Sequence, residues 1–318
     1  MSSPSATEKK TSTTRSTMWH SDGSVILQAQ DTQFRVHWSI LALNSTFFRD
    51  LQGLPQPPGQ PTIDGCPVID LAGDDVTDVE YLLKALYSPP FLCQKALPLA
   101  VIAAHIRLGR KYDFREVLDL AVERLSFDNP TTLAEYDALP APYPTRILPY
   151  DGIEFDIITL ARENAIMSVL PCAYYHLLIL HKTVDKLFEG VQRSDGSRAS
   201  LSLNALRECV SGRDKLMHAQ LDQQGSCGWY RFWAPGSDCT NSNGRCAQTR
   251  DARLRAYLDS PALRALAGFD PQHEANKQVC SACKHHISQS NADGRRKTWD
   301  RLPAFFGLPP WGELKDQP

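Results

Sequence analysis

The segment from Asp22 to Leu51 changes its hydrophobic period once, and this change constrains the fold more than any other feature of the chain. Val25, Leu27 and Ala29 alternate with Ile26, Gln28 and Gln30, Phe34 and Val36 flank Arg35, and turn-forming residues lie between the two runs. This spacing predicts two short strands joined as a hairpin. After His37 the spacing becomes helical, and the residues that define it are Ile40, Leu43, Phe47 and Leu51. The pattern therefore predicts a hairpin that runs directly into an amphipathic helix.

The same segment resembles the opening of a BTB/POZ domain. That family has an acidic residue before the first strand, an F-x-V-H sequence on the second strand, and L-A-x-x-S-x-x-F in the first helix. The residues that match this signature are Asp22, Phe34, Val36, His37, Leu41, Ala42, Ser45 and Phe48. Two positions depart from it, because Trp38 stands where a basic residue is common and Asn44 stands where Arg or Ala is common. By this resemblance His37 is a structural residue that links the hairpin to the helix.

Further strand and helix patterns follow in the first half of the chain. A strand is predicted at 66–71, and helices are predicted at 79–86, 97–108 and 117–125. The sequence at 108–113 resembles the one that joins the last helix pair of POZ domains, so the resemblance extends from Trp19 to Phe127. Because the strands come first and paired helices follow, this half is predicted to be an α+β domain, a small sheet covered by helices.

The chain is predicted to have four parts. They are a disordered tail at 1–17, a BTB/POZ domain at 18–128, a proline-rich linker at 129–152, and a mostly α-helical C-terminal region at 153–318 with a cysteine-rich segment. In the last part helical spacing is found at 155–187, interrupted by Pro171, at 203–217 and at 254–267, whereas 223–250 is irregular and strand patterns are lacking. The 318 residues are 42% hydrophobic and 22% charged, which is typical of a globular protein with room for two domains.

Charge and hydropathy limit the classes of partner. The formal net charge of -2 gives no reason to expect nucleic acid or an anionic membrane surface as a general partner. The longest uncharged stretch, 165–180, is interrupted by Pro171 and falls short of the ~20 apolar residues that span a bilayer. Residues 1–17 contain no apolar run and do not read as a secretory signal. We therefore expect an intracellular protein, cytoplasmic or nuclear, whose nine cysteines are reduced.

Cysteine spacing in the C-terminal region indicates a candidate metal site. Cys280 and Cys283 form a C-x2-C pair, the spacing that lets two thiolates reach one zinc ion from a tight turn. Cys239 and Cys246 form a looser pair that would complete four ligands. Further candidate ligands in the region are Cys227, His273, His285 and His286. The alternative is that these cysteines are free thiols, packed between helices as small apolar residues. A zinc ion here would be structural, and no other cofactor is indicated.

The C-terminal tail resembles fungal BTB-domain proteins. The matching sequences are the C-x-x-C pair, Gly294-Arg295-Arg296, Trp299-Asp300, Leu302-Pro303 and Phe306-Gly307-Leu308. This resemblance implies a structural role for the segment and bears less on metal binding.

Sequence motifs of common enzyme classes are absent from the chain. It contains no G-x-S-x-G, no G-x-x-x-x-G-K-[ST] and no G-x-G-x-x-G sequence. The H-E-x-x-H frame that begins at His273 fails, because Lys277 occupies the position of the second His. We therefore expect no enzymatic activity.

An interaction protein is the function that these observations favour. The resemblance to BTB/POZ domains implies association with protein partners, and we expect a homodimer whose interface comes from 18–27 and from Trp38, Leu41 and Phe48. A first alternative is a substrate adaptor that binds the cullin scaffold of a ubiquitin ligase, although no recognisable MATH or kelch reader follows. A second alternative is a transcription regulator with zinc-dependent DNA contact, against which stand the near-neutral charge and the absence of zinc-finger spacing.

Overall fold

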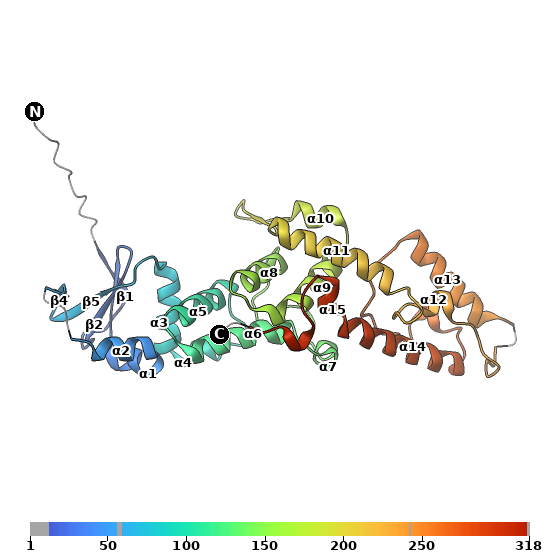
Figure 1. The fold of residues 1–318 in the computed structure, drawn as a ribbon, viewed down its shortest axis with the longest axis horizontal. Helices are drawn as coiled ribbons and strands as arrows, with labels where there is room; N and C mark the ends of the chain where they lie inside the picture. Colours follow the sequence, from blue (N-terminus) through green and yellow to red (C-terminus); the bar gives the residue numbers. More distant parts are fainter. Residues whose placement is uncertain (1–12, 56–58, 242, 317–318) are drawn as a thin grey trace, which may run out of the picture. The chain divides into compact units, whose positions relative to one another are not determined.

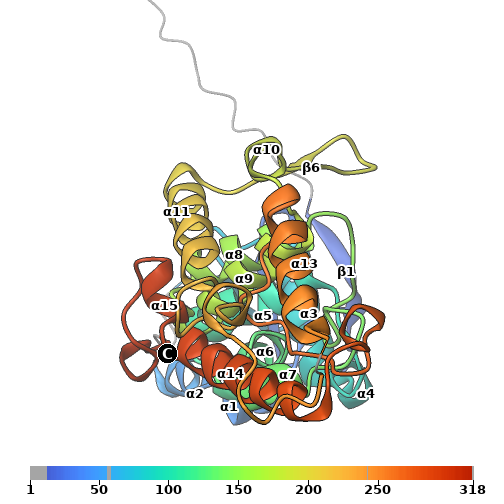
Figure 2. The same cartoon turned by 90° about the vertical axis from the view of Figure 1, so that its right-hand side faces the viewer.

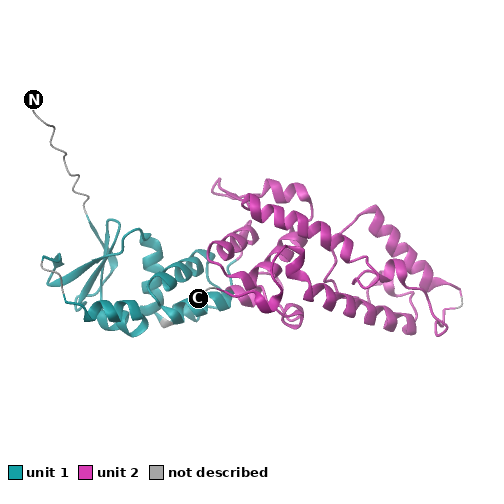
Figure 3. Cartoon of the chain, viewed as in Figure 1, with its two compact units in different colours: residues 1–124, 146–148, 318 teal, residues 125–145, 149–317 magenta. Residues whose placement is uncertain are grey.

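The computed structural model describes residues 13–55, 59–241 and 243–316. Within these ranges the chain forms two compact units (Figure 3). Unit 1 holds the residues up to Arg124 together with 146–148, and unit 2 holds 125–145 and those from Pro149 onward. Unit 1 combines a sheet with helices and unit 2 is mostly helical, which confirms the predicted fold class. No helix in the described ranges is both long enough and apolar enough to cross a membrane.

Unit 1 is built on a five-stranded sheet in the order β1-β3-β2-β5-β4 (Figure 1). The strands are β1 (Thr14–Trp19), β2 (Val25–Ala29), β3 (Thr32–Val36), β4 (Thr62–Ile63) and β5 (Cys66–Asp70). β2 and β3 pair antiparallel, with Gln30 in the turn at a positive φ of 51°, so the predicted hairpin is confirmed. β1 runs parallel to β3, and β5 runs parallel to β2.

Strand β1 corrects one prediction. Residues 14–17 fall within the predicted disordered tail, yet they form the first part of β1. The Thr14 N–H donates to the Asp31 carbonyl (2.7 Å), and the His20 N–H donates to the Arg35 carbonyl (3.0 Å). Backbone hydrogen bonds hold this strand and none of its six side chains is fully buried, so its sequence carries no apolar alternation. The remaining predicted tail, 1–12, lies outside the described residues.

Helices pack against this sheet to form one apolar core. They are α1 (Trp38–Asn44), α2 (Thr46–Gly53), α3 (Val76–Tyr87), α4 (Pro89–Leu92), α5 (Leu99–Lys111) and α6 (Arg115–Asp128), the last of which ends in unit 2. Side chains from β2, β3 and the helices meet in a core that includes Phe34, Phe48 and Phe114, each at most 1% exposed. Burying a side chain of this size contributes about 1.5–3 kcal/mol to stability.

The helix predicted after the hairpin is broken in two at Ser45. This residue has extended backbone (φ -142°), and its Oγ accepts a hydrogen bond from the Phe48 N–H (3.0 Å) as the N-cap of α2. The same hydroxyl donates to the Tyr112 carbonyl (2.5 Å). The predicted apolar stripe was therefore wrong, because the break rotates Leu43 outward, where it is 77% exposed, and directs Leu41 and Phe48 into the core instead.

Unit 2 is an assembly of helices with one very short hairpin. Its elements are α7 (Leu133–Asp137), α8 (Ile153–Glu163), η1 (Met167–Val169), α9 (Leu170–Leu180), α10 (Val184–Glu189), β6 (Val191–Gln192), β7 (Arg198–Ala199), α11 (Leu203–Ala219), α12 (Trp229–Phe232), α13 (Arg245–Asp259), η2 (Glu274–Asn276), α14 (Ser281–Asp300), α15 (Leu302–Phe305) and η3 (Trp311–Glu313). The two strands were not predicted, because two residues are too few to show a periodicity.

Helix boundaries in unit 2 differ from the predicted ones for local reasons. The long predicted helix at 155–187 is divided twice. One break lies at 164–166, where Ala165 has a positive φ of 49°, and the other lies at 181–183, before the N-cap Thr183 starts α10. Pro171 does not break the helix, because it lies in the first turn of α9, where a proline removes no hydrogen bond. α13 begins at Arg245, inside the segment predicted to be irregular, and ends before Pro261.

The proline-rich segment predicted as a linker, 129–152, is packed along much of its length. The ring of Tyr143 stacks on that of His176 with 3.8 Å between centroids, and the Tyr143 hydroxyl donates to Asn129 Oδ1 (3.2 Å) in unit 2. In unit 1 the Leu97 N–H donates to the Arg146 carbonyl (3.2 Å). The segment therefore forms backbone and side-chain contacts of its own.

Unit 2 contains a separate apolar cluster around the short helix α12. Its buried residues are Cys227, Trp229, Tyr230, Cys246, Val279, Cys283 and Ile287. α12 packs against both α13 and α14, while these two longer helices lie apart along most of their lengths (Figures 1 and 2). The cluster thus assembles three helices around aromatic and sulfur-containing side chains.

Candidate functional site

The motif residues Asp22 and His37 belong to a small network in unit 1. The backbone N–H of His37 donates to the Tyr87 hydroxyl (2.9 Å), and its Nδ1 lies 3.0 Å from the same oxygen. Its Nε2 lies 3.3 Å from the Asp22 carboxylate, which is largely exposed. The ring of His20 stacks on Tyr87 at 4.7 Å between centroids. His37 therefore ties the end of the hairpin to the last residue of α3 as well as to the start of α1.

Electrostatics in this network follow from the same contacts. The pKa of Asp22 is lowered by a backbone N–H and by the His37 ring. Burial raises the pKa of Tyr87, so its hydroxyl stays protonated at neutral pH and is available as a hydrogen-bond donor. Phe34 and Val36, the other residues of the motif in β3, are fully buried in the core. These contacts link the hairpin to α1 and α3 and place Phe34 and Val36 in the core.

The three residues predicted to form the interface are inside the core instead. Trp38 is 8% exposed, Leu41 is fully buried and Phe48 is 1% exposed. Their side chains contact the sheet and neighbouring helices of unit 1, so they are not available to a partner, and the prediction was wrong for them. The apolar residues that α1 and α2 leave exposed are Leu43 (77%) and Phe47 (41%).

The predicted interface range 18–27 divides into an exposed part and a buried part. Val25, Ile26 and Leu27 are buried in the sheet. Residues 14–19 form β1, which is the edge strand beyond β3 and has no further strand beside it among the described residues. An edge strand offers unpaired N–H and C=O groups to another chain. Within this range a partner can therefore reach the β1 edge and the exposed residues Ser21, Asp22 and Ser24.

Comparison with known families agrees with this topology. Residues 20–128 match the family described as BTB/POZ domain. The chain carries a BTB/POZ domain. The match covers the hairpin with its F-x-V-H motif, the broken helix and the paired helices α3 to α6. No curated protein matches the chain, so the likeness of the tail to fungal BTB proteins stays a prediction from sequence.

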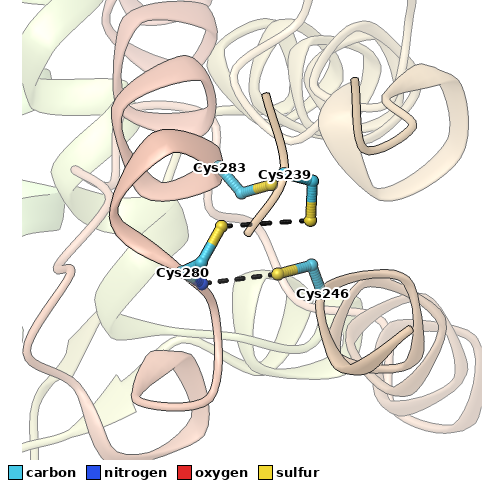
Figure 4. Close-up of side chains that lie close together, drawn as sticks. All are labelled: Cys239, Cys246, Cys280 and Cys283. Atoms are coloured by element: carbon cyan, nitrogen blue, oxygen red, sulfur yellow. Dashed lines mark hydrogen bonds between the residues drawn. The ribbon is translucent and has the colours of Figure 1, made fainter. Parts of the chain in front are cut away.

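Beyond the BTB/POZ domain, unit 2 brings the four predicted cysteine ligands together (Figure 4). Cys239 precedes α13, Cys246 lies in its first turn, Cys280 is the N-cap of α14, and Cys283 lies in the first turn of α14. Their sulfur atoms all lie within 4.8 Å of one another, and those of Cys239 and Cys280 are 3.9 Å apart. In Figure 4 the four sulfurs point toward a common centre.

The other candidate ligands lie outside this four-cysteine cluster. Among the described residues the group of close ligand atoms contains neither Cys227 nor any histidine. His286 instead pairs with Asp238 (2.7 Å), and His273 caps η2 through its Nδ1. The Cys227 sulfur lies 4.0 Å from the Arg264 carbonyl oxygen. The nine cysteines of the chain are all free of disulfides.

Hydrogen bonds and burial make the four sulfurs unequal. The Cys246 sulfur accepts from the Cys280 N–H (3.3 Å) and from the Asn241 side-chain amide (3.3 Å). A backbone N–H from Cys283 lowers the pKa of Cys280 to about 6, whereas burial raises the pKa of Cys283. N–H donors thus favour a thiolate at Cys280 and contact the Cys246 sulfur, whereas burial favours the neutral thiol at Cys283.

Sequence reasoning missed several residues of these sites. The Tyr87 hydroxyl accepts a hydrogen bond from the His37 N–H, although Tyr87 is 50 positions away along the chain. No local sequence pattern indicates such a partner. Asn241 lies between two of the cysteines, and an amide two residues after Cys239 was the available signal for a donor to sulfur. Leu43 and Phe47 were noted as apolar, but their exposure depends on the break at Ser45.

Proposed function

We propose that the chain is a non-enzymatic interaction protein whose BTB/POZ domain associates with a second copy of itself. The observation that carries the proposal is the exposure of Leu43 and Phe47 on α1 and α2, the helices that the family resemblance implicates in dimer contacts. Exposed large apolar side chains gain about 25 cal/mol for each Å² that a partner covers. The open edge at β1 offers backbone groups for further pairing.

The proposal is tested by the mass of the full chain in solution. Light scattering over a range of concentrations should give a dimer for the wild type. Leu43→Lys should raise the dimer dissociation constant at least about tenfold, because a desolvated ammonium would replace an apolar contact. Leu43 is near the C-terminus of α1, where a lysine suits the helix dipole, so the monomer itself should stay folded.

A matched control separates an interface effect from a general effect of charge. Leu258 is 64% exposed and lies near the C-terminal end of α13 in unit 2, so Leu258→Lys makes the same change outside the BTB/POZ domain. It should leave the dimer intact. A wild-type chain that is monomeric at every concentration, or a dimer that both variants weaken equally, would count against self-association through α1 and α2.

A second candidate is binding to a cullin scaffold through the last helices of the domain. The observation that favours it is Leu120 on α6, which is 42% exposed within unit 1. A pull-down of purified cullin by the full chain, abolished by Leu120→Lys and unaffected by Leu258→Lys, would support this adaptor function. DNA contact, the remaining alternative, requires binding to duplex DNA that is strongest at low salt, and no binding there would end it.

A further inference from the structure

We propose that Cys239, Cys246, Cys280 and Cys283 bind one zinc ion as a closed structural site in unit 2. This inference is independent of the function proposed above, because all four residues lie outside the BTB/POZ domain. The alternative of unrelated free thiols requires four cysteines from three separate segments to converge without a shared ligand.

Distances between the sulfur atoms suit tetrahedral coordination. With Zn–S bonds of about 2.3 Å, two ligands of one tetrahedral zinc lie roughly 3.8 Å apart. The sulfurs of Cys239 and Cys280 are 3.9 Å apart, and every pair is within 4.8 Å. Disulfide-bonded sulfurs would be about 2.05 Å apart, which the free state of these cysteines excludes. A small contraction of the cluster brings all four sulfurs to zinc-binding distance.

The surroundings of the Cys246 and Cys280 sulfurs include groups that stabilise a thiolate, which is the species that binds zinc. α13 and α14 both direct their N-terminal turns at the cluster, and the partial positive charge at a helix N-terminus stabilises an anion. The Asn241 amide and the Cys280 N–H donate to the Cys246 sulfur, as outer partners of a metal ligand do. Four neighbouring thiolates would repel one another strongly, so a divalent cation at their centre completes the arrangement.

The ligand set also fixes the class of metal and its role. Four thiolates in tetrahedral geometry select zinc, or iron as the less common choice. Since four protein ligands leave no open position for water or substrate, the ion would serve structure and not catalysis.

Zinc would supply a connection that packing alone provides weakly. α13 has 15 residues, and Cys246 is its only fully buried side chain. α14 lies apart from α13 along most of its length, and the sulfur cluster joins the two N-terminal turns (Figures 2 and 4). We infer that the ion holds α13 and the preceding loop against α14.

Metal content of the full chain tests the proposal. Protein produced in zinc-supplemented medium and purified without chelator should contain one zinc per chain by elemental analysis. Cys280→Ser and Cys283→Ser should each lose most of it, because serine is a poor zinc ligand. Cys93→Ser is the control, since Cys93 is an exposed cysteine outside the cluster, and it should retain one zinc.

A measurement on the wild type covers the case in which the serine variants fail to fold. The metal is exchanged for Co²⁺, whose visible absorption distinguishes tetrahedral thiolate ligation from octahedral oxygen ligation. Intense visible bands with a 1:1 endpoint would support the site. Iron in place of zinc, a metal-free wild type, or disulfides among the four cysteines would each overturn it.

Discussion

The helices α5 and α13 are of similar length but are held in place by different means. α5 in unit 1 has 13 residues and buries nine of them, mostly aliphatic, in the core. α13 in unit 2 has 15 residues and fully buries only Cys246. Because apolar burial is the main favourable term in folding, α5 is held largely by its own buried residues. α13 instead relies on Cys246 and on the partly buried Leu254 and Tyr257, which pack on the cluster around α12. A helix can thus be held in place by its own apolar residues, as α5 is, or by a metal cross-link such as the one proposed for α13.

Removing the metal should produce the largest difference in stability between α5 and α13. Hydrogen exchange measured by mass spectrometry, with and without a strong chelator, should show α13 losing protection by several kcal/mol. Zinc binding contributes on the order of 10 kcal/mol to folding in small zinc domains. α5 should exchange at the same rate in both conditions. Equal exchange in α13 with and without chelator would show that it is held by packing after all.

Truncating a core side chain should have the opposite outcome, a loss of stability in unit 1. Phe48→Ala removes a side chain that is 1% exposed and touches the rings of Tyr112 and Phe114. It should lower the free energy of unfolding of unit 1 by about 3–5 kcal/mol, measured by denaturant titration. Phe188→Ala, at a residue 61% exposed in unit 2, is the control and should change stability by less than about 0.5 kcal/mol. Similar losses in both variants would contradict the core described for unit 1.

Acid should weaken unit 2 through His176. Burial lowers the pKa of this histidine to about 4, from 6.5 when it is exposed. The unfolded chain therefore binds a proton more readily than the folded one, so the contribution to stability is present above pH 6.5 and is lost as the pH falls toward 4. By pH 5 the loss should reach roughly 2 kcal/mol.

Denaturant titration of the wild type and of His176→Phe at pH 7 and pH 5 measures this loss. The phenylalanine variant keeps a ring to stack on Tyr143 but cannot titrate, so its stability should change less between the two pH values. An equal drop in both proteins would remove His176 as the cause. Burial also lowers the pKa of His105 in unit 1, which should give a smaller effect of the same sign.

The smallest expected effect compares one helix cap from each unit. Ser45→Ala in unit 1 removes the N-cap of α2 and the hydrogen bond to the Tyr112 carbonyl, for a loss of about 1–2 kcal/mol. Ser202→Ala in unit 2 removes one longer bond at the start of α11 (3.4 Å), for a loss of about 0.5–1 kcal/mol. Denaturant midpoints should rank the variants in that order. The opposite ranking would show that the Tyr112 contact adds nothing.

Much of unit 1 could be predicted from sequence, because its elements are recorded in local periodicity. The hairpin of β2 and β3 and the helices α3 and α5 follow directly from apolar spacing. Strand β1 could not be predicted, since its side chains show no apolar alternation and its place in the sheet depends on hydrogen bonds to residues elsewhere in the chain. The break at Ser45 was missed for a related reason: its second partner, Tyr112, is 67 residues away.

The candidate sites were predictable to different degrees. The C-x2-C spacing nominates Cys280 and Cys283 from sequence, since the residues of a short turn stay close in any fold. Their meeting with Cys239 and Cys246 depends on the tertiary arrangement of α13 and α14. The prediction that Trp38, Leu41 and Phe48 form an interface was wrong for the same reason. A helical pattern identifies an apolar residue but does not show whether the chain itself already covers it.

The hydrogen bond from Ser45 to the Tyr112 carbonyl also sets an order in time. A ribosome releases the chain from its N-terminus, and the 67 residues that separate the two partners take roughly 3–13 seconds to make at about 5–20 residues per second. During that interval α2 lacks one of its anchors, and two of the rings that pack beside Phe48, those of Tyr112 and Phe114, do not yet exist. The nascent domain therefore leaves part of the Phe48 ring open to the cell's chaperones until residues 112–114 have emerged.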